Sequence, residues 1–274
     1  MEITNWLKGA INYIVRYFDF NQRAKAGYNI PKLENNTVLI TGGGSGIGLA
    51  FAEALVQLGN TVIICGRNAA KLERAKSLYP ALHTIRCDIS NDQDINLLLE
   101  TIGSHFPTLN FLINNAAIQN NYHFLDGTSH ISAIQQEIDT NLTANIKLID
   151  MLLPILQHQS TSTIFNITSA LARVPKENAP VYCATKAGMH IFTKALRYQL
   201  ETSNIRVFEI VPPLVDTNMT IGRGRGKISP RQVVRESLRA FSQGQYEIKI
   251  EKVKFLFALY RLFPGLAEAM IRKS

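Results

Sequence analysis

The chain has 274 residues, of which 46% are hydrophobic and 18% charged, and its formal net charge is +8 at pH 7. This length suits one large α/β domain, and the composition is that of an ordinary soluble globule. The positive charge lies from Gly222 onward, where twelve Lys and Arg oppose four acids, whereas the rest of the chain is balanced. Because no DNA- or RNA-binding motif accompanies it, this pattern argues against nucleic-acid binding. It indicates either a local anionic partner or a solvated basic face.

The cysteines and histidines predict no metal site. Cys65, Cys87 and Cys183 show no C-x-x-C spacing, and the six histidines form neither H-x-x-x-H nor H-E-x-x-H. Two of the cysteines fall in apolar, strand-like runs, so we expect buried, reduced thiols and a cytoplasmic protein.

An amphipathic segment occupies the start of the chain. Apolar residues recur at helical spacing from Trp6 to Phe18, and Lys8, Asn12 and Arg16 interrupt them. The segment is too polar to span a bilayer and lacks the unbroken apolar core of a signal peptide. We expect residues 1–34 to form an N-terminal amphipathic extension.

Residues 35–250 alternate short β-branched runs with helical patterns. This alternation predicts βαβ units and a single α/β domain with a parallel, doubly wound sheet and helices on both faces. Most of the strand-like runs are almost continuously apolar, as expected when helices cover both faces of the sheet. We expect strands at Thr37–Thr41, Thr61–Cys65, His83–Cys87, Phe111–Asn114, Thr163–Thr168 and Arg206–Val211. We expect helices at Gly46–Leu58, Ala69–Leu78, Asp92–Ile102, Ile131–Leu156 and Pro180–Glu201.

A glycine-rich turn joins the first expected strand to the first expected helix. Its glycines are Gly42, Gly43, Gly44, Gly46 and Gly48. At such a corner, backbone N–H groups and a helix N-terminus bind a diphosphate, so the turn predicts a dinucleotide site. A tight turn without a ligand remains the alternative.

Tyr182 and Lys186 are the most informative residues of the chain, and Ser169 precedes Tyr182 by thirteen positions. A Tyr and a Lys four apart project from one face of a helix. There the ammonium can stabilise the phenolate and lower the pKa of the phenol. Such a phenol can pass a proton to or from a carbonyl or alcohol oxygen.

The end of the chain, residues 251–274, is both apolar and basic, and a Gly- and Arg-rich loop at 221–227 precedes it. The Val253–Ile271 segment is too short and too interrupted to span a membrane. An apolar face with local bases is typical of a helix lying on an anionic membrane surface. Docking on its own domain and completion of a dimer are the alternatives.

Four motifs follow one another in order between about Asn35 and Thr217. They are Gly42-x-x-x-Gly46-Ile47-Gly48, Asn114-Asn115-Ala116-Ala117, Ser169 and Tyr182-x-x-x-Lys186. Together they resemble the classical short-chain dehydrogenase/reductase family, and Pro180–Ala187 and Pro212–Thr217 resemble its DltE-like bacterial members. The resemblance implies a Rossmann fold, an NAD(P)(H) cofactor, chemistry at an alcohol or carbonyl carbon, and a homo-oligomer.

The resemblance also implies roles for individual residues. Tyr182 matches the acid/base, Lys186 its partner on the nicotinamide ribose, Ser169 the residue that orients the substrate oxygen, and Asn141 the holder of a relay water. On the residues alone, a core aromatic for Tyr182 and a polar surface residue for Asn141 remain open. The expected cofactor-binding residues are Gly42, Gly44, Ser45, Gly46, Ile47, Gly48, Arg67, Asp88, Asn115, Ala116, Tyr182, Lys186, Pro212, Val215 and Thr217.

The sequence departs from the family pattern at two positions. Ala117 stands where the family usually has Gly, and Pro213 replaces the Gly that normally follows Pro212. The second change stiffens the start of the expected substrate loop.

The end of the second expected strand bears on the choice of cofactor. It reads Cys65-Gly66-Arg67-Asn68, with no acid to bind a ribose 2′-OH. Arg67 can pair with a 2′-phosphate, so NADP(H) is preferred and NAD(H) stays possible; a solvated surface Arg is the alternative. Asp88 matches a position near the adenine or caps the following helix.

The expected function is an oxidoreductase that transfers a hydride between NADP(H) and a small-molecule carbonyl or secondary alcohol. A catalytically silent NAD(P)-binding sensor of the same fold is the alternative. We expect the substrate to lie among residues 118–125, 171–178 and 213–229, whose mixed polarity does not identify it.

Overall fold

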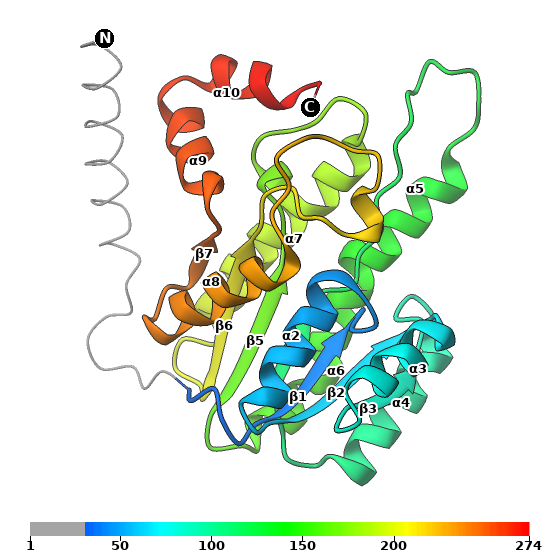
Figure 1. Ribbon diagram of the computed structural model, residues 1–274, viewed down its shortest axis with the longest axis vertical. Coiled ribbons are helices and arrows are strands. Elements are labelled where there is room, and N and C mark those ends of the chain that lie inside the picture. The colour runs from blue at the N-terminus through cyan, green and yellow to red at the C-terminus, as the bar shows by residue number, and fades with distance from the viewer. Residues whose placement is uncertain (1–30, 274) are drawn as a thin grey trace.

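The computed structural model describes residues 31–273. They form three layers, with a parallel sheet of seven strands between two layers of helices (Figure 1). The strand order is β3-β2-β1-β4-β5-β6-β7. This arrangement confirms the predicted doubly wound α/β fold. The strands are β1 (Thr37–Thr41), β2 (Thr61–Gly66), β3 (His83–Arg86), β4 (Leu109–Asn114), β5 (Ser162–Ile167), β6 (Ile205–Val211) and β7 (Glu247–Lys249).

Helices cover both faces of the sheet. The core on one face includes residues of α2 (Gly46–Gln57), α3 (Ala69–Leu78) and α8 (Pro230–Ser242). The core on the other face includes residues of α4 (Asp92–His105), α6 (Ala144–Gln157) and α7 (Pro180–Gln199). α5 (Ile131–Ile138) precedes α6 and contacts α7.

The direction of strand addition reverses between β1 and β4, which are paired neighbours in the sheet. Connections from β1 and from β4 therefore leave toward opposite faces, and a crevice opens at the carboxyl ends of these strands. In open α/β sheets such a switch point is where ligands bind.

An aromatic cluster fills the first face of the sheet. The ring of Phe165 on β5 lies 4.8–6.2 Å, centroid to centroid, from those of Phe51, Phe111, Phe208 and Phe241. Edge-to-face packing of this kind favours one fixed arrangement of the strands and of α2 and α8. The opposite face is packed mainly with Leu and Ile side chains.

All six expected strands are present, whereas the long helix expected at Ile131–Leu156 is interrupted. A π-helical turn, Asp139–Thr143, separates α5 from α6. The side chain of Asn145, at the start of α6, donates hydrogen bonds to the carbonyls of Thr140 (3.1 Å) and Asn141 (3.0 Å) in this turn. Periodicity alone does not reveal such a turn, because apolar residues continue on both sides of it.

Two elements were missing from the sequence prediction. β7 has only three residues and pairs with β6, so its pattern is too short to recognise. α8 carries a recognisable signal, since Ser229 caps it by accepting from the backbone N–H of Gln232 and Pro230 begins it.

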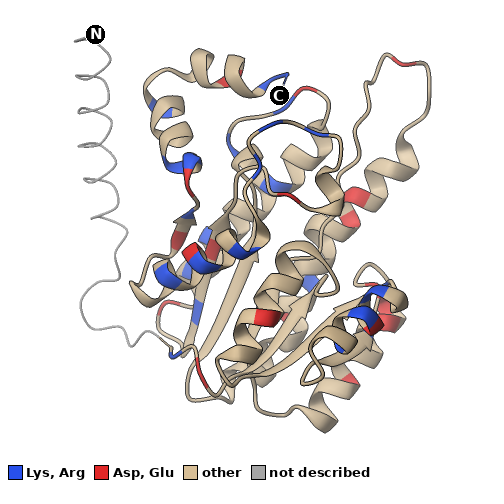
Figure 2. Ribbon diagram, viewed as in Figure 1, with Lys and Arg blue, Asp and Glu red and all other residues tan. Residues whose placement is uncertain are grey.

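The C-terminal segment forms two short helices, α9 (Lys252–Leu262) and α10 (Pro264–Ile271), at the end of the molecule where the parallel strands terminate (Figure 1). Val253, Leu256 and Phe257 of α9 pack with Val174 and Val211 in a third apolar cluster. One face of the segment therefore docks on its own domain. Figure 2 shows Lys and Arg along α8, α9 and the loops at this end.

No helix within residues 31–273 is long and apolar enough to cross a membrane. The amphipathic extension expected at residues 1–34, with its helix at Trp6–Phe18, lies almost entirely outside the described residues.

Candidate active site

The glycine-rich turn leaves β1 and enters α2 at the switch point. Gly42 and Gly46 have backbone φ angles of +64° and +57°, values that residues other than glycine rarely adopt. A Cβ on Gly48 would lie 2.6 Å from the Gly42 carbonyl oxygen, so that position requires glycine. Ser45 precedes α2 and its side chain makes no capping hydrogen bond. The first N–H groups of α2 are thus left uncapped by Ser45, as a diphosphate site requires.

Two side chains fix this turn against β4. The hydroxyl of Thr41 accepts hydrogen bonds from the backbone N–H groups of Asn115 and Ala116, both at 3.0 Å. The side-chain amide of Asn115 donates back to the carbonyls of Thr41 (2.9 Å) and Gly42 (3.3 Å). The conformation of the turn therefore depends on the segment that follows β4.

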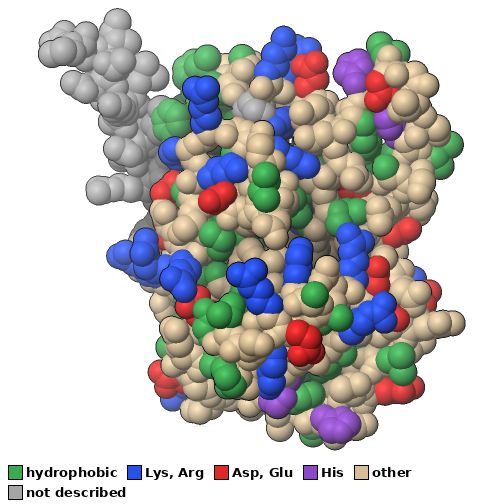
Figure 3. All heavy atoms as spheres, turned by 45° about the vertical axis from the view of Figure 1, so that its right-hand side comes forward, with side chains coloured by type: hydrophobic (Ala, Val, Ile, Leu, Met, Phe, Trp, Pro, Cys, Tyr) green, Lys and Arg blue, Asp and Glu red, His purple; other side chains and the backbone are tan. Residues whose placement is uncertain are grey.

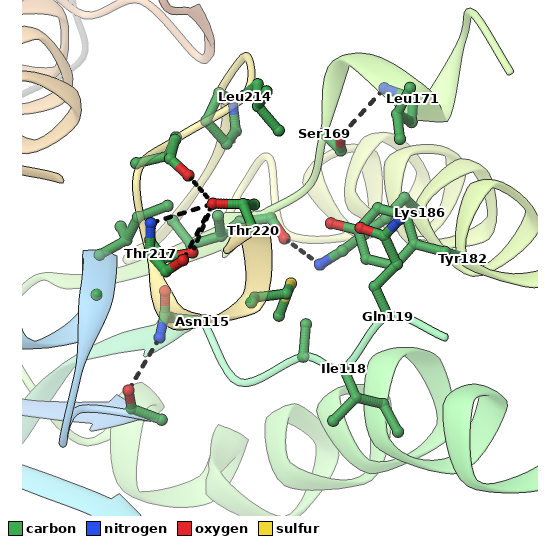
Figure 4. A pocket seen from close by; sticks show the side chains of 18 of the residues that line it. Asn115, Ile118, Gln119, Ser169, Leu171, Tyr182, Lys186, Leu214, Thr217 and Thr220 are labelled. Atoms are coloured by element: carbon green, nitrogen blue, oxygen red, sulfur yellow. Dashed lines mark hydrogen bonds between the residues drawn. The ribbon is translucent and has the colours of Figure 1, made fainter. Parts of the chain in front are cut away.

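Tyr182 and Lys186 lie one turn apart near the start of α7, and both are buried. Figure 4 shows them together on one side of the cavity, with Thr217 and Thr220 on another. Lys186 Nζ donates a 2.8 Å hydrogen bond to the carbonyl of Ile167 and lies 5.7 Å from the centroid of the Tyr182 ring. The predicted helical pairing of these two residues is present.

Ser169 follows β5 and begins a short 3₁₀ helix, Ala170–Ala172. Its hydroxyl oxygen accepts from the backbone N–H of Leu171 at 3.1 Å, which orients the side chain. The carbonyl of Pro212 accepts from the backbone N–H of Ala170 at 3.2 Å and joins this turn to the loop after β6. Ser169 and Tyr182 are thereby held beside one cavity.

Burial controls the ionisation of the pair. It raises the pKa of Tyr182 above its ordinary value, and a hydrogen bond with the Ser169 side chain opposes that rise. Burial also lowers the pKa of Lys186 to about 8. The lowered phenol pKa that we expected from the sequence is absent, because removal from water outweighs the other effects. At neutral pH Tyr182 is a phenol that can donate a proton.

Asn141 lies in the π-helical turn and is fully buried, so the alternative of a polar surface residue is wrong. Its side-chain oxygen accepts from the backbone N–H of Ile118, and its amide donates to the carbonyl of Ile118, both at 2.8 Å. The amide also donates to the hydroxyl of Thr185 at 3.2 Å. The side chain thus positions the segment after β4 against α7.

The ends of β2 and β3 form the far end of the cavity. Arg67 is exposed there, just before α3. Lys71, in the first turn of α3, lines the same cavity. Asp88 accepts hydrogen bonds from the backbone N–H and hydroxyl of Ser90. It does not cap α4, a role that belongs to Asn91, so the capping alternative for Asp88 is wrong.

The loop after β6 lies against the glycine turn. A Cβ on Gly46 would lie 3.1 Å from the Thr217 methyl group, so the two segments touch. The backbone N–H of Thr217 donates to the Thr220 hydroxyl at 3.1 Å, and Val215 is buried. Pro212, Val215 and Thr217 all line the cavity.

One cavity of about 990 Å³ connects these parts. Of the expected site residues, Gly48 and Asn141 alone do not line it, and both act by supporting its walls. Sequence reasoning missed Lys71, Lys252 and the apolar side chains of α9 and α10 that line it, whereas Lys176 lies in the expected segment 171–178. Lys71 could have been found, because it falls in the first turn of the helix expected at Ala69–Leu78, directly after the strand end that carries Arg67.

The buried charge of Lys186 has a measurable cost in stability. Between pH 8 and 10.5 the unfolded chain binds more protons at this position than the native chain, so native stability rises with pH there. We expect Lys186→Met to raise the free energy of unfolding at pH 7 by about 3 kcal/mol, with the gain shrinking above pH 8. Urea unfolding across this pH range measures it, and exposed Lys194→Met is the control. A less stable Lys186→Met protein at pH 7 would contradict this account.

Comparison with known proteins places the chain in a family. The family model described as short chain dehydrogenase matches residues 36–227. The "uncharacterized oxidoreductase DltE" of Bacillus subtilis is 41% identical over 232 residues, covering 82% of this chain and 92% of that protein. An uncharacterized oxidoreductase of Staphylococcus epidermidis is 30% identical over 199 residues, covering 72% of this chain and 86% of that protein.

Solved structures share the fold. A short chain dehydrogenase of Burkholderia cenocepacia, in complex with NADP, superposes with a TM-score of 0.79 at 23% identity, covering 89% of this chain and all of that one. A short chain dehydrogenase/reductase of Burkholderia phymatum, in complex with NAD, superposes with a TM-score of 0.77 at 18% identity, covering 89% of this chain and 98% of that one. The family match and the DltE relative carry the assignment: the chain belongs to the short-chain dehydrogenase family.

Proposed function

We propose that the protein is an NADP(H)-dependent oxidoreductase that interconverts a carbonyl and an alcohol, with Tyr182 as the acid/base. The supporting observation is that Tyr182, Lys186 and Ser169 line the same cavity as an uncapped, glycine-rich helix N-terminus. A proton donor, an oxygen-binding hydroxyl and a diphosphate site thus share one space.

The proposed reduction divides the work among three side chains. Ser169 donates a hydrogen bond to the substrate oxygen and fixes its position. Tyr182 donates its phenolic proton to that oxygen as the carbon accepts a hydride, which the bound nicotinamide supplies. Lys186 holds the nicotinamide ribose and, as an ammonium, stabilises the phenolate that remains.

The residues of the cavity fit a dinucleotide. Gly42, Gly44, Ser45, Gly46 and Ile47 line it at the N-terminus of α2, so backbone N–H groups can hold the diphosphate. Asp88 and Asn115 line it further along, and Thr217 can reach the carboxamide end. Similarly folded proteins bind NADP in one case and NAD in another, so the choice must come from this chain.

Tyr182→Phe tests the acid/base role. We expect NADPH to bind within about twofold of wild type, because the ring and its packing remain, while turnover falls by about 10²–10⁴-fold. Reduced-nicotinamide absorbance with a panel of ketones and secondary alcohols measures turnover, and quenching of protein fluorescence measures binding.

Ser77→Ala, in an exposed part of α3, is the matched hydroxyl deletion and should keep wild-type turnover. Undiminished turnover in Tyr182→Phe would refute the acid/base role. Cofactor binding without turnover in the wild type would favour the sensor alternative.

NADP(H) preference is proposed from the two cations at the end of β2. Arg67 and Lys71 line the cavity, and no carboxylate of residues 31–273 forms an ion pair with either. A Cβ on Gly44 would lie 3.2 Å from Lys71 Cβ, so Lys71 stands directly beside the glycine turn. Both cations are therefore available to a 2′-phosphate.

Arg67→Ala tests this preference. We expect NADPH binding to weaken by about 1–3 kcal/mol, the range of a charged hydrogen bond, while NADH binding changes little. Titration calorimetry with both cofactors measures the difference, and Arg74→Ala on the exposed part of α3 is the control. Equal losses for the two cofactors would show that Arg67 acts on the fold instead.

Association with an anionic membrane surface is also proposed. Phe263 and Leu266 are about half exposed and do not belong to the apolar cluster that docks α9 and α10 on the domain, and Arg272 and Lys273 follow α10. An apolar face with adjacent bases suits a lipid interface. A homo-oligomer is a separate proposal, supported by exposed Ile191 and Tyr198 on α7.

Phe263→Ser/Leu266→Ser tests the membrane proposal. We expect full-length protein to sediment with phosphatidylserine vesicles at low salt, and the double variant to stay in the supernatant. Light scattering reports the oligomeric state of both proteins. If wild type ignores the vesicles and the variant loses a dimer, the face joins two copies.

A further inference from the structure

Almost all of the charged side chains that line the cavity are positive. Within residues 31–273 it has one acidic lining residue, Asp88, which lies at the end of β3. Its basic lining residues are Arg67, Lys71, Lys176, Lys186, Arg223, Arg225 and Lys252. Arg67 and Lys71 serve the end beside the glycine turn, and Lys186 serves the catalytic centre. The remaining four have no role in the proposed function.

Lys176 and Arg223 lie close to the catalytic tyrosine. The backbone N–H of Lys176 donates to the sulfur of Cys183 at 3.4 Å, which ties Lys176 to the residue directly after Tyr182. Burial raises the pKa of Tyr182 and the charge of Arg223 opposes that rise, and both residues line the same cavity. The pKa of Lys176 is lowered by burial and by the charge of Arg223, so these two cations are near enough to repel each other.

The guanidinium of Arg223 makes one hydrogen bond that holds it in place and keeps one buried N–H group without an acceptor. Its Nη2 donates to the carbonyl of Gln119 at 3.2 Å, which fixes the loop after β6 against the segment after β4. Its Nη1 is buried and has no hydrogen-bond partner among the described residues. A buried guanidinium N–H without an acceptor is costly, so a ligand in the cavity that supplied an acceptor to Arg223 would relieve that cost.

No acid among residues 31–273 forms an ion pair with Lys176 or Arg223. Burial raises the pKa of Glu137, and the charge of Arg223 opposes that rise. Glu137 does not line the cavity, and its carboxylate accepts a hydrogen bond from the backbone N–H of Asn120 at 3.2 Å. Glu177 forms an ion pair with Arg272, with 2.8 Å between Oε2 and Nε. Asp216 forms one with Lys227, with 3.6 Å between Oδ1 and Nζ. Lys176 and Arg223 therefore form no ion pair of 4 Å or less with an acid of residues 31–273.

Apolar side chains line the cavity together with these cations. They come from the loop after Ser169, from the loop after β6 and from the two C-terminal helices. Figure 3 shows Lys and Arg gathered over the middle and upper part of a face with hydrophobic side chains between them. The apolar lining residues are Leu171, Leu214, Met219, Phe255, Leu256 and Met270.

We propose that the substrate is an anionic amphiphile, a carbonyl or alcohol compound with an apolar chain and a carboxylate or phosphate group, and that Lys176 and Arg223 bind the anionic group. This inference rests on the proposed function, because it places the anion beside the carbon that reacts. A carboxylate or phosphate supplies the acceptor that Arg223 Nη1 lacks and relieves the repulsion between the two cations. The apolar walls bind the chain.

Matched substrates test the charge. Oxodecanoates with the ketone at C4 to C9 are compared with their methyl esters, with NADPH and at low and high salt. For the best ketone position we expect kcat/KM of the acid to exceed that of the ester by about tenfold or more, as a charged hydrogen bond provides. Added salt should bring the kcat/KM values of the acid and the ester closer together, because it screens the charge of the carboxylate.

Variants locate the effect. We expect Arg223→Gln and Lys176→Gln each to lower the acid-to-ester ratio of kcat/KM by about fivefold or more. Arg239→Gln and Lys194→Gln, at exposed positions outside the cavity, should leave the ratio at the wild-type value. A wild-type ratio near one, or a ratio unchanged in both cavity variants, would overturn the inference while leaving the proposed oxidoreductase intact.

A binding experiment separates the two proposals. Decanoate and decyl phosphate have no carbonyl to reduce, and calorimetry on the NADPH-loaded protein measures their binding against decanol. Tighter binding of either anion that is lost in Arg223→Gln supports the anion site even if no ketone is reduced. The tighter of the two identifies carboxylate or phosphate as the preferred group. Equal binding of decanol and both anions would refute the site.

Discussion

The hydrogen bond from Lys186 Nζ to the carbonyl of Ile167, 2.8 Å long, joins α7 to the end of β5. Because Ser169 follows β5 and Tyr182 lies one turn before Lys186, this contact helps to set the distance between the serine and the tyrosine. It also holds a buried ammonium, whose desolvation lowers the pKa of Lys186 to about 8. The buried ammonium lowers the free energy of unfolding relative to an apolar residue packed at the same position.

Two loops complete the site by touching each other. The segment after β4 is fixed by Thr41, Asn115 and Asn141, and the loop after β6 rests on the glycine turn through Thr217. Arg223 then joins these two segments through the carbonyl of Gln119. A change in either loop therefore reaches both the diphosphate site and the region beside Tyr182, although the loops are about a hundred residues apart in the chain.

The strand-helix alternation was enough to predict the doubly wound sheet, and the glycine turn and the Tyr182–Lys186 pair were enough to predict where its cavity lies. The π-helical turn at Asp139–Thr143 was not predictable, because it depends on the side-chain hydrogen bonds of Asn145. β7 escaped recognition because a three-residue strand has too little pattern. The raised pKa of Tyr182 could not be predicted either, since it arises from burial that spacing does not report.

The central claim is that a hydride reaches the substrate carbon while Tyr182 supplies the proton. Reduction of an accepted ketone with NADPH carrying deuterium at both C4 positions tests the hydride step most directly, with the product analysed by mass spectrometry and NMR. We expect a single deuterium on the carbinol carbon. A product whose carbinol carbon carries hydrogen from water, with the label retained by the cofactor, would contradict it.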